Sequence, residues 1–163
     1  MDALGIADGA HVADLGAGGG WFTVRLAHRV GPNGVVYAED VQRPMVEAID
    51  RRVQREGFLN VRPILGTPVD PHLPAGIPFV LMVDMYAQLP DPVALLRHVA
   101  EALAPGGRVG IVDFTRAGSG GPGPELDERV DPRAIVRDAE RAGLKLLRTE
   151  TFLRYQYLLV FGR

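Results

Sequence analysis

A short apolar segment that runs directly into a cluster of glycines limits the possible folds of this chain more than any other feature. Residues 11–15 read His-Val-Ala-Asp-Leu, and residues 16–20 read Gly-Ala-Gly-Gly-Gly. The apolar residues predict a buried strand, and the glycines predict a sharp turn whose backbone can approach a ligand closely. A helix is expected from Trp21 to Val30, and its first turn offers unpaired amides and the positive end of the helix dipole. We therefore expect an anionic or polar ligand at this turn.

The same order of strand and helix recurs along the chain. Further strands are expected at 35–38, closing on 39–40, and at 61–65, 79–83 and 108–114, with helices around 45–53, 92–103 and 132–143. Two last strands, 144–148 and 155–161, are close enough in sequence to pair as an antiparallel hairpin. This order predicts an α/β fold of three layers. Its centre is a Rossmann-like, doubly wound, mostly parallel seven-stranded sheet with a C-terminal antiparallel hairpin.

Two connections carry no helical signal. Prolines at 68, 71, 74 and 78 forbid a regular helix between the third and fourth strands. Residues 115–130 are rich in glycine and proline and predict a long loop. Ligands on doubly wound sheets bind beyond the carboxyl ends of the strands, so we expect the site at that edge.

Composition narrows the class of ligand. A chain of 163 residues with 47% hydrophobic residues suits a single domain, 1–163. The net charge of −2 gives no basic surface for nucleic acid or an anionic membrane. There is no cysteine, and the four histidines lack the spacing of metal ligands, so no metal site is expected. Without a signal segment or a long apolar run, a cytoplasmic protein acting on a small molecule is expected.

The spacing of the glycines separates the possible nucleotide-like ligands. A dinucleotide-binding turn has the pattern G-x-G-x-x-G, whereas Trp21 stands here where the third glycine is needed. No Lys-Ser or Lys-Thr pair follows, which excludes a phosphate-binding P-loop. Trp21 itself is expected to pack into the core. With Asp14 two places before Gly16, the segment resembles the first motif of the class I S-adenosylmethionine-dependent methyltransferases.

That resemblance extends along nearly the whole chain and is nearest to the small ubiquinone/menaquinone-biosynthesis-like methyltransferase domains. It implies that an acid ending the second strand binds both ribose hydroxyls, because one carboxylate can accept two hydrogen bonds. Asp40 is our choice for this acid, and Glu39 is the alternative. The resemblance further implies that the Gly66-Thr67 loop flanks adenine, and that Asp84 and Tyr86 lie beside the methyl group. The cofactor-binding residues it implies are Asp14, Gly16, Ala17, Gly18, Gly20, Asp40, Val41, Gly66, Thr67 and Asp84.

The chain departs from the pattern of this family at three places. Relatives often have an aspartate where Thr67 stands, to hold the adenine amine, and the nearest acid here is Asp70. Many relatives have a histidine after the tyrosine of the fourth strand, but Ala87 and Gln88 follow here. Only about ten residues precede the first strand, so little or no N-terminal cap is expected. A lid would then come from the 115–130 loop or from a partner chain, or the site would have no lid.

The resemblance implies methyl transfer from S-adenosylmethionine, leaving S-adenosylhomocysteine, to a small-molecule acceptor. Alignment and exclusion of water are the main tasks of the protein in such a displacement. The sequence does not determine a catalytic residue. Asp84 and Tyr86 are candidates for a base, and Tyr155 is a weaker candidate. The alternative is a degenerate or accessory domain that binds the cofactor without methylating anything, and a third possibility is a nicotinamide-dependent oxidoreductase. The acceptor and the oligomeric state are not predicted.

Overall fold

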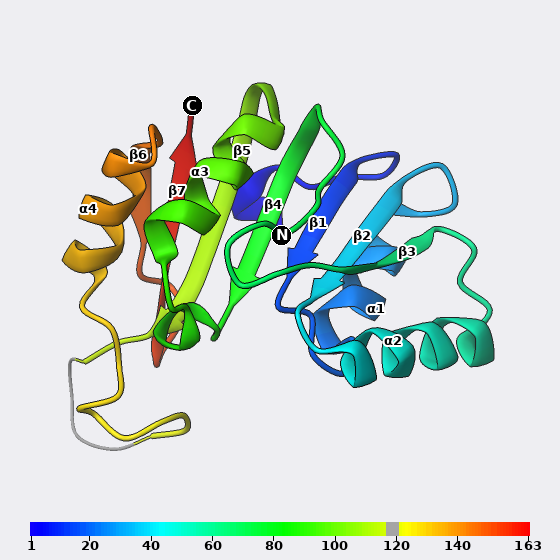
Figure 1. Ribbon diagram of the computed structural model, residues 1–163, viewed down its shortest axis with the longest axis horizontal. Helices are drawn as coiled ribbons and strands as arrows, with labels where there is room; N and C mark the ends of the chain where they lie inside the picture. The colour runs from blue at the N-terminus through cyan, green and yellow to red at the C-terminus, as the bar shows by residue number, and fades with distance from the viewer. Residues whose placement is uncertain (117–120) are drawn as a thin grey trace.

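The computed structural model describes residues 1–116 and 121–163 (Figure 1). Part of the loop expected at 115–130 therefore lies outside the described residues. The strands are β1 (His11–Leu15), β2 (Val35–Asp40), β3 (Val61–Leu65), β4 (Ile77–Val83), β5 (Leu103–Phe114), β6 (Lys145–Glu150) and β7 (Gln156–Gly162). The helices are α1 (Trp21–Val30), α2 (Arg43–Glu56), α3 (Pro92–Ala102) and α4 (Pro132–Arg141), with short 3-10 helices η1 (Asp2–Leu4) and η2 (Tyr86–Gln88).

All seven strands form one sheet in the order β3-β2-β1-β4-β5-β7-β6. The first five strands of that order are parallel, and β7 pairs antiparallel with both β5 and β6. The predicted fold class is confirmed, including the C-terminal hairpin. The chain winds outward from β1 to β3 and then crosses back to β4, so the topological switch point lies between β1 and β4. Ligands on such sheets bind at this point.

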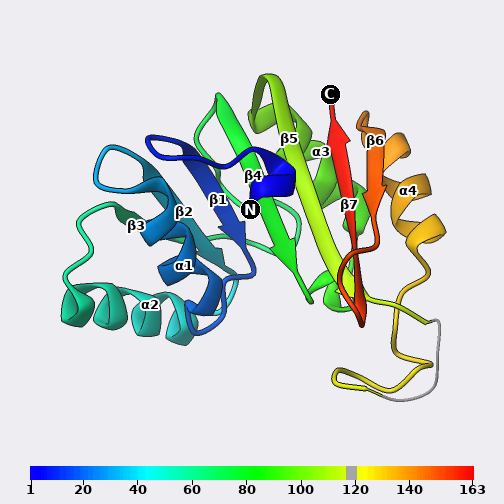
Figure 2. The same cartoon turned by 180° about the vertical axis from the view of Figure 1, so that it is seen from behind.

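Helices cover both faces of the sheet (Figures 1 and 2). Apolar residues of α1 and α2 pack on one face, among them Leu26 and Ile49. Apolar residues of α3 and α4 pack on the other, among them Leu96 and Ile135. Both α3 and α4 begin at an Asp-Pro pair whose aspartate accepts a hydrogen bond from a backbone amide of the first turn, which satisfies a donor that the helix leaves unpaired.

The connection from β3 to β4 contains no helix over residues 66–76 and runs along the face of β2 and β1 instead (Figure 1). This confirms the prediction from its prolines. Two strands begin earlier than expected, because β4 begins at Ile77 and β5 at Leu103. These two residues pair with each other ahead of a register shift in the ladder. The sequence did not predict these first residues of β4 and β5, because Pro78 and Pro105 lie there and proline disfavours a strand. Among the described residues, no helix has the length and apolar content needed to cross a membrane.

Candidate functional site

A cleft of about 500 Å³ opens at the carboxyl ends of β1, β2 and β4. Several residues expected to bind the cofactor line it together: Gly16, Gly18, Asp40, Val41, Thr67 and Asp84. Their elements are far apart in sequence but adjacent in the sheet, because parallel strands deliver their carboxyl ends to one edge. The cleft also includes Glu39 and Met85.

The glycine turn requires the absence of side chains. Gly16, Gly18 and Gly20 have φ angles of 64°, 52° and 78°, a left-handed region that other residues rarely adopt. A Cβ on Gly16 would lie 2.6 Å from the Met85 sulfur, whereas one on Gly18 would meet no atom within 4 Å. The backbone at Gly18 therefore faces open space in the cleft. Gly20 lies beyond the cleft and caps the start of α1.

Asp14 supports this turn from behind and does not line the cleft. Its carboxylate is buried and accepts a hydrogen bond of 2.7 Å from the Thr23 hydroxyl, which ties β1 to α1. Burial raises the pKa of Asp14 to about 7, against the opposite effect of the Thr23 hydrogen bond. Ala17 is also outside the lining and donates its amide to the Glu39 carbonyl. Asp14 therefore supports the turn by joining β1 to α1, and Ala17 joins the backbone of the turn to β2.

Asp40 lies at the end of β2 and holds the glycine turn against that strand. One carboxylate oxygen accepts the Gly18 amide at 2.9 Å, and the other accepts the Gln42 amide at 2.8 Å. Each carboxylate oxygen has two lone-pair sites, so each can still accept one hydrogen bond from a ligand. Asp40 is thus fixed in position, and its carboxylate can accept further hydrogen bonds from a ligand in the cleft.

Glu39 is a second acid of the cleft, on the opposite face of β2. It is 3% exposed; one carboxylate oxygen accepts the Gly16 amide at 3.4 Å, and the other, Oε1, has no hydrogen-bond partner among the described residues. Burial raises the pKa of Glu39 to about 7; the Gly16 amide opposes this, and the charges of Asp40 and Asp14 add to it. Gly66 leaves room for this side chain, since a Cβ there would overlap Oε1.

The loop after β3 folds around its own residues. Thr67 lines the cleft and exchanges hydrogen bonds with the backbone of Asp70. The Asp70 carboxylate accepts the His72 amide and does not line the cleft. Asp70 therefore does not replace the missing aspartate at position 67 in this structure.

Asp84 lies at the exposed rim, where β4 ends. Its φ of 53° is unusual for a residue with a side chain, and such strain is found most often at functional sites. The side-chain amide of Gln156, a residue of β7, donates a 2.7 Å hydrogen bond to the Asp84 carboxylate. Desolvation by neighbouring atoms raises the pKa of Asp84, and the Gln156 hydrogen bond acts against this.

The other two candidate bases do not line the cleft. The hydroxyl of Tyr86 donates a 3.1 Å hydrogen bond to Asp138 of α4, and the ring is buried in the core on that face. Burial, followed by the charge of Asp138, raises the pKa of this hydroxyl far above its usual value. Tyr155 packs beside Gly121 of the long loop. This geometry gives Tyr86 a structural role.

Trp21 is exposed, contrary to the expectation that it packs into the core. Its exposed fraction is 59%, and the Arg25 guanidinium stacks 3.7 Å from the ring centroid. The buried side of α1 includes Leu26 and Val30, and Trp21 does not lie on that side. The only tryptophan of the chain therefore stands next to the glycine turn.

A second pocket, which the sequence did not predict, lies beside the cleft and has a volume of about 440 Å³. Asp84 and Gln88 line both cavities, and Asp113, Phe114 and Glu128 complete the polar and aromatic wall of the second. Asp113 stands one residue before the end of β5, beside the end of β4. That position could have been recognised as the partner of Asp84, because β4 and β5 are adjacent parallel strands.

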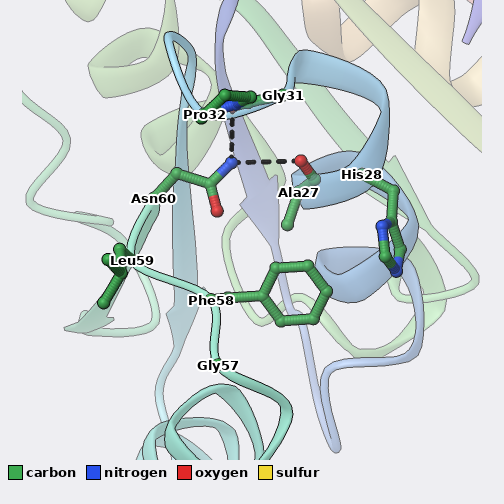
Figure 3. A pocket seen from close by; sticks show the side chains of 8 residues that line it. All are labelled: Ala27, His28, Gly31, Pro32, Gly57, Phe58, Leu59 and Asn60. Carbon is green, nitrogen blue, oxygen red and sulfur yellow. Dashed lines mark hydrogen bonds between the residues drawn. The ribbon is translucent and has the colours of Figure 1, made fainter.

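A further hollow lies at the opposite, amino-terminal edge of the sheet (Figure 3). The amide of Asn60 donates to the carbonyls of Ala27 and Gly31 there, at 3.0 and 2.8 Å. Phe58 and His28 pack edge to face beside it. With its polar group committed to the backbone, Asn60 joins α1 to β3 and stabilises the fold.

Across the ranges that the structure describes, no cluster of three or more histidine, aspartate or glutamate side chains could hold a metal ion.

Comparison with known proteins gives consistent matches. Residues 12–107 match a family model described as a methyltransferase domain. A nocamycin O-methyltransferase from Saccharothrix syringae is 36% identical over 112 residues, which cover 68% of this chain and 40% of that protein. A demethylmenaquinone methyltransferase from Anoxybacillus flavithermus is 27% identical over 110 residues, 67% of this chain and 46% of that protein. This chain thus spans less than half the length of these two relatives.

The fold also matches solved structures. An S-adenosylmethionine-dependent methyltransferase from Aquifex aeolicus superposes with a TM-score of 0.91 at 25% identity. The match covers 98% of this chain and 85% of the Aquifex protein. The similarity therefore includes the C-terminal hairpin, which lies beyond the residues that the family model matches.

Proposed function

Because this chain belongs to the methyltransferase domain family and shares the fold of an S-adenosylmethionine-dependent methyltransferase, we propose that it transfers a methyl group from S-adenosylmethionine to a small organic acceptor. One observation carries the proposal. The glycine turn and the acid that ends β2 meet Asp84 in one cleft at the switch point of the sheet. The two curated relatives are named for nocamycin and demethylmenaquinone, which supports a small organic acceptor.

The residues of the cleft fit this cofactor. Gly18 leaves open space above its backbone, and Asp40 has a free acceptor position on each carboxylate oxygen for the ribose hydroxyls. We assign the ribose to Asp40 and the methionine end to the turn at Gly16. Glu39 lines the same cleft as a second acid. Thr67 and Val41 complete the wall that we assign to the adenosine.

The chemistry of the cofactor limits what the protein has to supply. A sulfonium carries an activated methyl group, so catalysis depends on aligning the acceptor and excluding water. The strained backbone of Asp84, held by Gln156, fixes the rim of the cleft where β4 ends. From the described part of the loop that precedes α4, Pro124 and Glu128 line the second pocket together with Asp84.

Isothermal titration with S-adenosylmethionine and S-adenosylhomocysteine tests the binding half of the proposal. Both should bind, and Asp40→Asn should weaken binding by about ten- to a hundredfold, because a hydrogen bond to a charged group contributes about 1.5–3 kcal/mol. Glu101→Gln, on the exposed face of α3, is the matched control and should leave affinity unchanged. If neither cofactor form binds, or NAD binds in their place, the proposal fails.

Turnover separates an enzyme from a degenerate or accessory domain. A panel of phenols, enols and amines incubated with methyl-labelled S-adenosylmethionine should give a labelled product, with one equivalent of S-adenosylhomocysteine for each methyl transferred. Cofactor binding without transfer to any member of the panel would instead favour the degenerate alternative.

A further inference from the structure

The second pocket adjoins the cleft that we assign to the cofactor. Asp84 and Gln88 line both cavities, so a ligand in the second pocket would lie directly beside one in the first. The pairing of β4 with β5 explains why the two cavities lie side by side. Val83 pairs with Val112, and the Asp84 amide donates to the Val112 carbonyl at 2.9 Å. Asp84 and Asp113 therefore follow paired residues of adjacent strands.

Asp113 is a buried carboxylate with an unused oxygen. The residue is 4% exposed, and its Oδ1 accepts the amide of Phe114 at 2.7 Å. Its Oδ2 is buried and has no well-formed hydrogen bond within the described part of the chain. Burial raises the pKa of Asp113 and the charge of Asp84 adds to this, while the amides of Phe114 and Tyr86 oppose it. Buried polar groups in proteins normally find a partner, so this weakly partnered oxygen, on a residue that lines the pocket, favours a hydrogen-bond donor from a ligand there.

The walls of the pocket define the charge of that ligand. Asp84, Asp113 and Glu128 contribute three carboxylates to its lining, and no lysine or arginine is among the described residues that line it. The nearby guanidinium of Arg129 donates to the carbonyls of Pro124 and Thr115, both at 2.9 Å. That cation is committed to holding the loop. The pocket therefore disfavours anions and favours groups that donate hydrogen bonds.

Apolar surface completes the pocket. Phe114 lies at the end of β5, and Pro124 lies on the loop that follows. Together with Ala87 they offer a wall for a flat hydrocarbon body. A ligand with an aromatic or alicyclic body and a hydroxyl or amine at one end satisfies both parts of the pocket.

We propose that this pocket holds the methyl acceptor as a neutral molecule with an O–H or N–H group, and that Asp113 accepts the proton of that group. The proposal rests on the methyltransferase function above. The acceptor oxygen or nitrogen forms a bond to the methyl carbon, and the carbon–sulfur bond breaks with its electron pair left on sulfur. The proton of the acceptor passes to Oδ2 of Asp113, so the products are a methyl ether or amine, a neutral thioether and a protonated carboxyl that releases its proton to water.

Binding of three matched probes to the protein saturated with S-adenosylhomocysteine tests this. We choose 4-methylphenol, 4-methylaniline and 4-methylbenzoate, which share one ring and differ in the polar group, and follow them by NMR titration. The phenol or the aniline should bind, and which of the two is tighter distinguishes a hydroxyl from an amine acceptor. The benzoate should bind at least about tenfold more weakly, because it lacks a donor and meets three carboxylates.

The variant Asp113→Asn assigns the effect to this side chain. It should weaken the donor probes by about tenfold and strengthen the benzoate, while affinity for S-adenosylhomocysteine stays at the wild-type value. Glu140→Gln, an exposed acid on α4, is the control that should change nothing. Tighter binding of the benzoate to the wild type, no binding of any probe, or no change in Asp113→Asn would overturn the pocket assignment. Failure of the wild type to bind S-adenosylhomocysteine would instead refute the cofactor proposal.

Discussion

Replacing Glu39 by glutamine should make the protein more stable, although Glu39 lies in the proposed site. The pKa of this carboxyl is raised from 4.5 to about 7, chiefly by burial. Folding therefore resists its ionisation. Because each pKa unit corresponds to about 1.4 kcal/mol, the full shift corresponds to about 3 kcal/mol. A neutral side chain of the same shape avoids that cost.

The sign of the pH dependence follows from the direction of the shift. Below about pH 4.5 the carboxyl is protonated in both the folded and the unfolded chain, and its contribution to stability is fully present. Between pH 4.5 and about 7 the unfolded chain loses the proton first, so stability falls as pH rises. Above about 7 the folded protein holds a buried charge. The advantage of Glu39→Gln should thus be small near pH 4.5 and complete near pH 8.5.

The local geometry lowers the expected gain. The glutamine carbonyl can keep the Gly16 amide, but its NH2 group takes the place of the unpartnered oxygen and also lacks a partner. An unsatisfied buried amide costs about 1–3 kcal/mol, so the net gain at pH 8.5 is expected at up to about 2 kcal/mol. Urea unfolding followed by circular dichroism at pH 5 and 8.5 measures it, with Glu101→Gln as the exposed control. An equal effect at both pH values, or a loss at pH 8.5, would refute the reasoning.

Three further substitutions test other parts of the structure. Gly16→Ala should lower the free energy of unfolding by at least about 1–3 kcal/mol, because alanine is strained at a φ of 64° and its Cβ would press on Met85; denaturation measures this, and full stability would contradict it. Asn60→Ala should cost about 1–3 kcal/mol through two lost hydrogen bonds, yet titration should show unchanged cofactor affinity, since that hollow is remote from the cleft. Leu4→Ala should cost about 2–5 kcal/mol in thermal or urea unfolding, because Leu4 is fully buried against Gly110 of β5; a smaller loss would mean that η1 is not docked.

Sequence periodicity and capping residues predicted most of the fold. The bounds of β1, α1 and β3 match the expected ranges, because glycine turns and alternating apolar runs mark their ends. The Asp-Pro pairs before α3 and α4 located both helix starts. The extensions of β4 and β5 were missed, since they depend on pairing between residues 77 and 103, which no local pattern records.

The residues of the site that were predicted from the sequence lie on motifs. The glycine turn and Asp40 follow recognisable patterns, and the structure brings them into one cleft with Asp84. Asp113 carries no motif, and its role depends on the adjacency of β4 and β5 and on the loop that covers it. Tyr86 was proposed as a base from its position after β4, but the direction of its hydroxyl depends on Asp138, 52 residues away.

A crystal structure with bound S-adenosylhomocysteine tests the central claim most directly. It should show the ribose hydroxyls on the Asp40 carboxylate, the methionine end at the turn of Gly16 and Gly18, and the sulfur on the side of the cleft that Asp84 shares with the second pocket. Binding of the ligand at another edge of the sheet, or with its ribose away from both Asp40 and Glu39, would contradict the account.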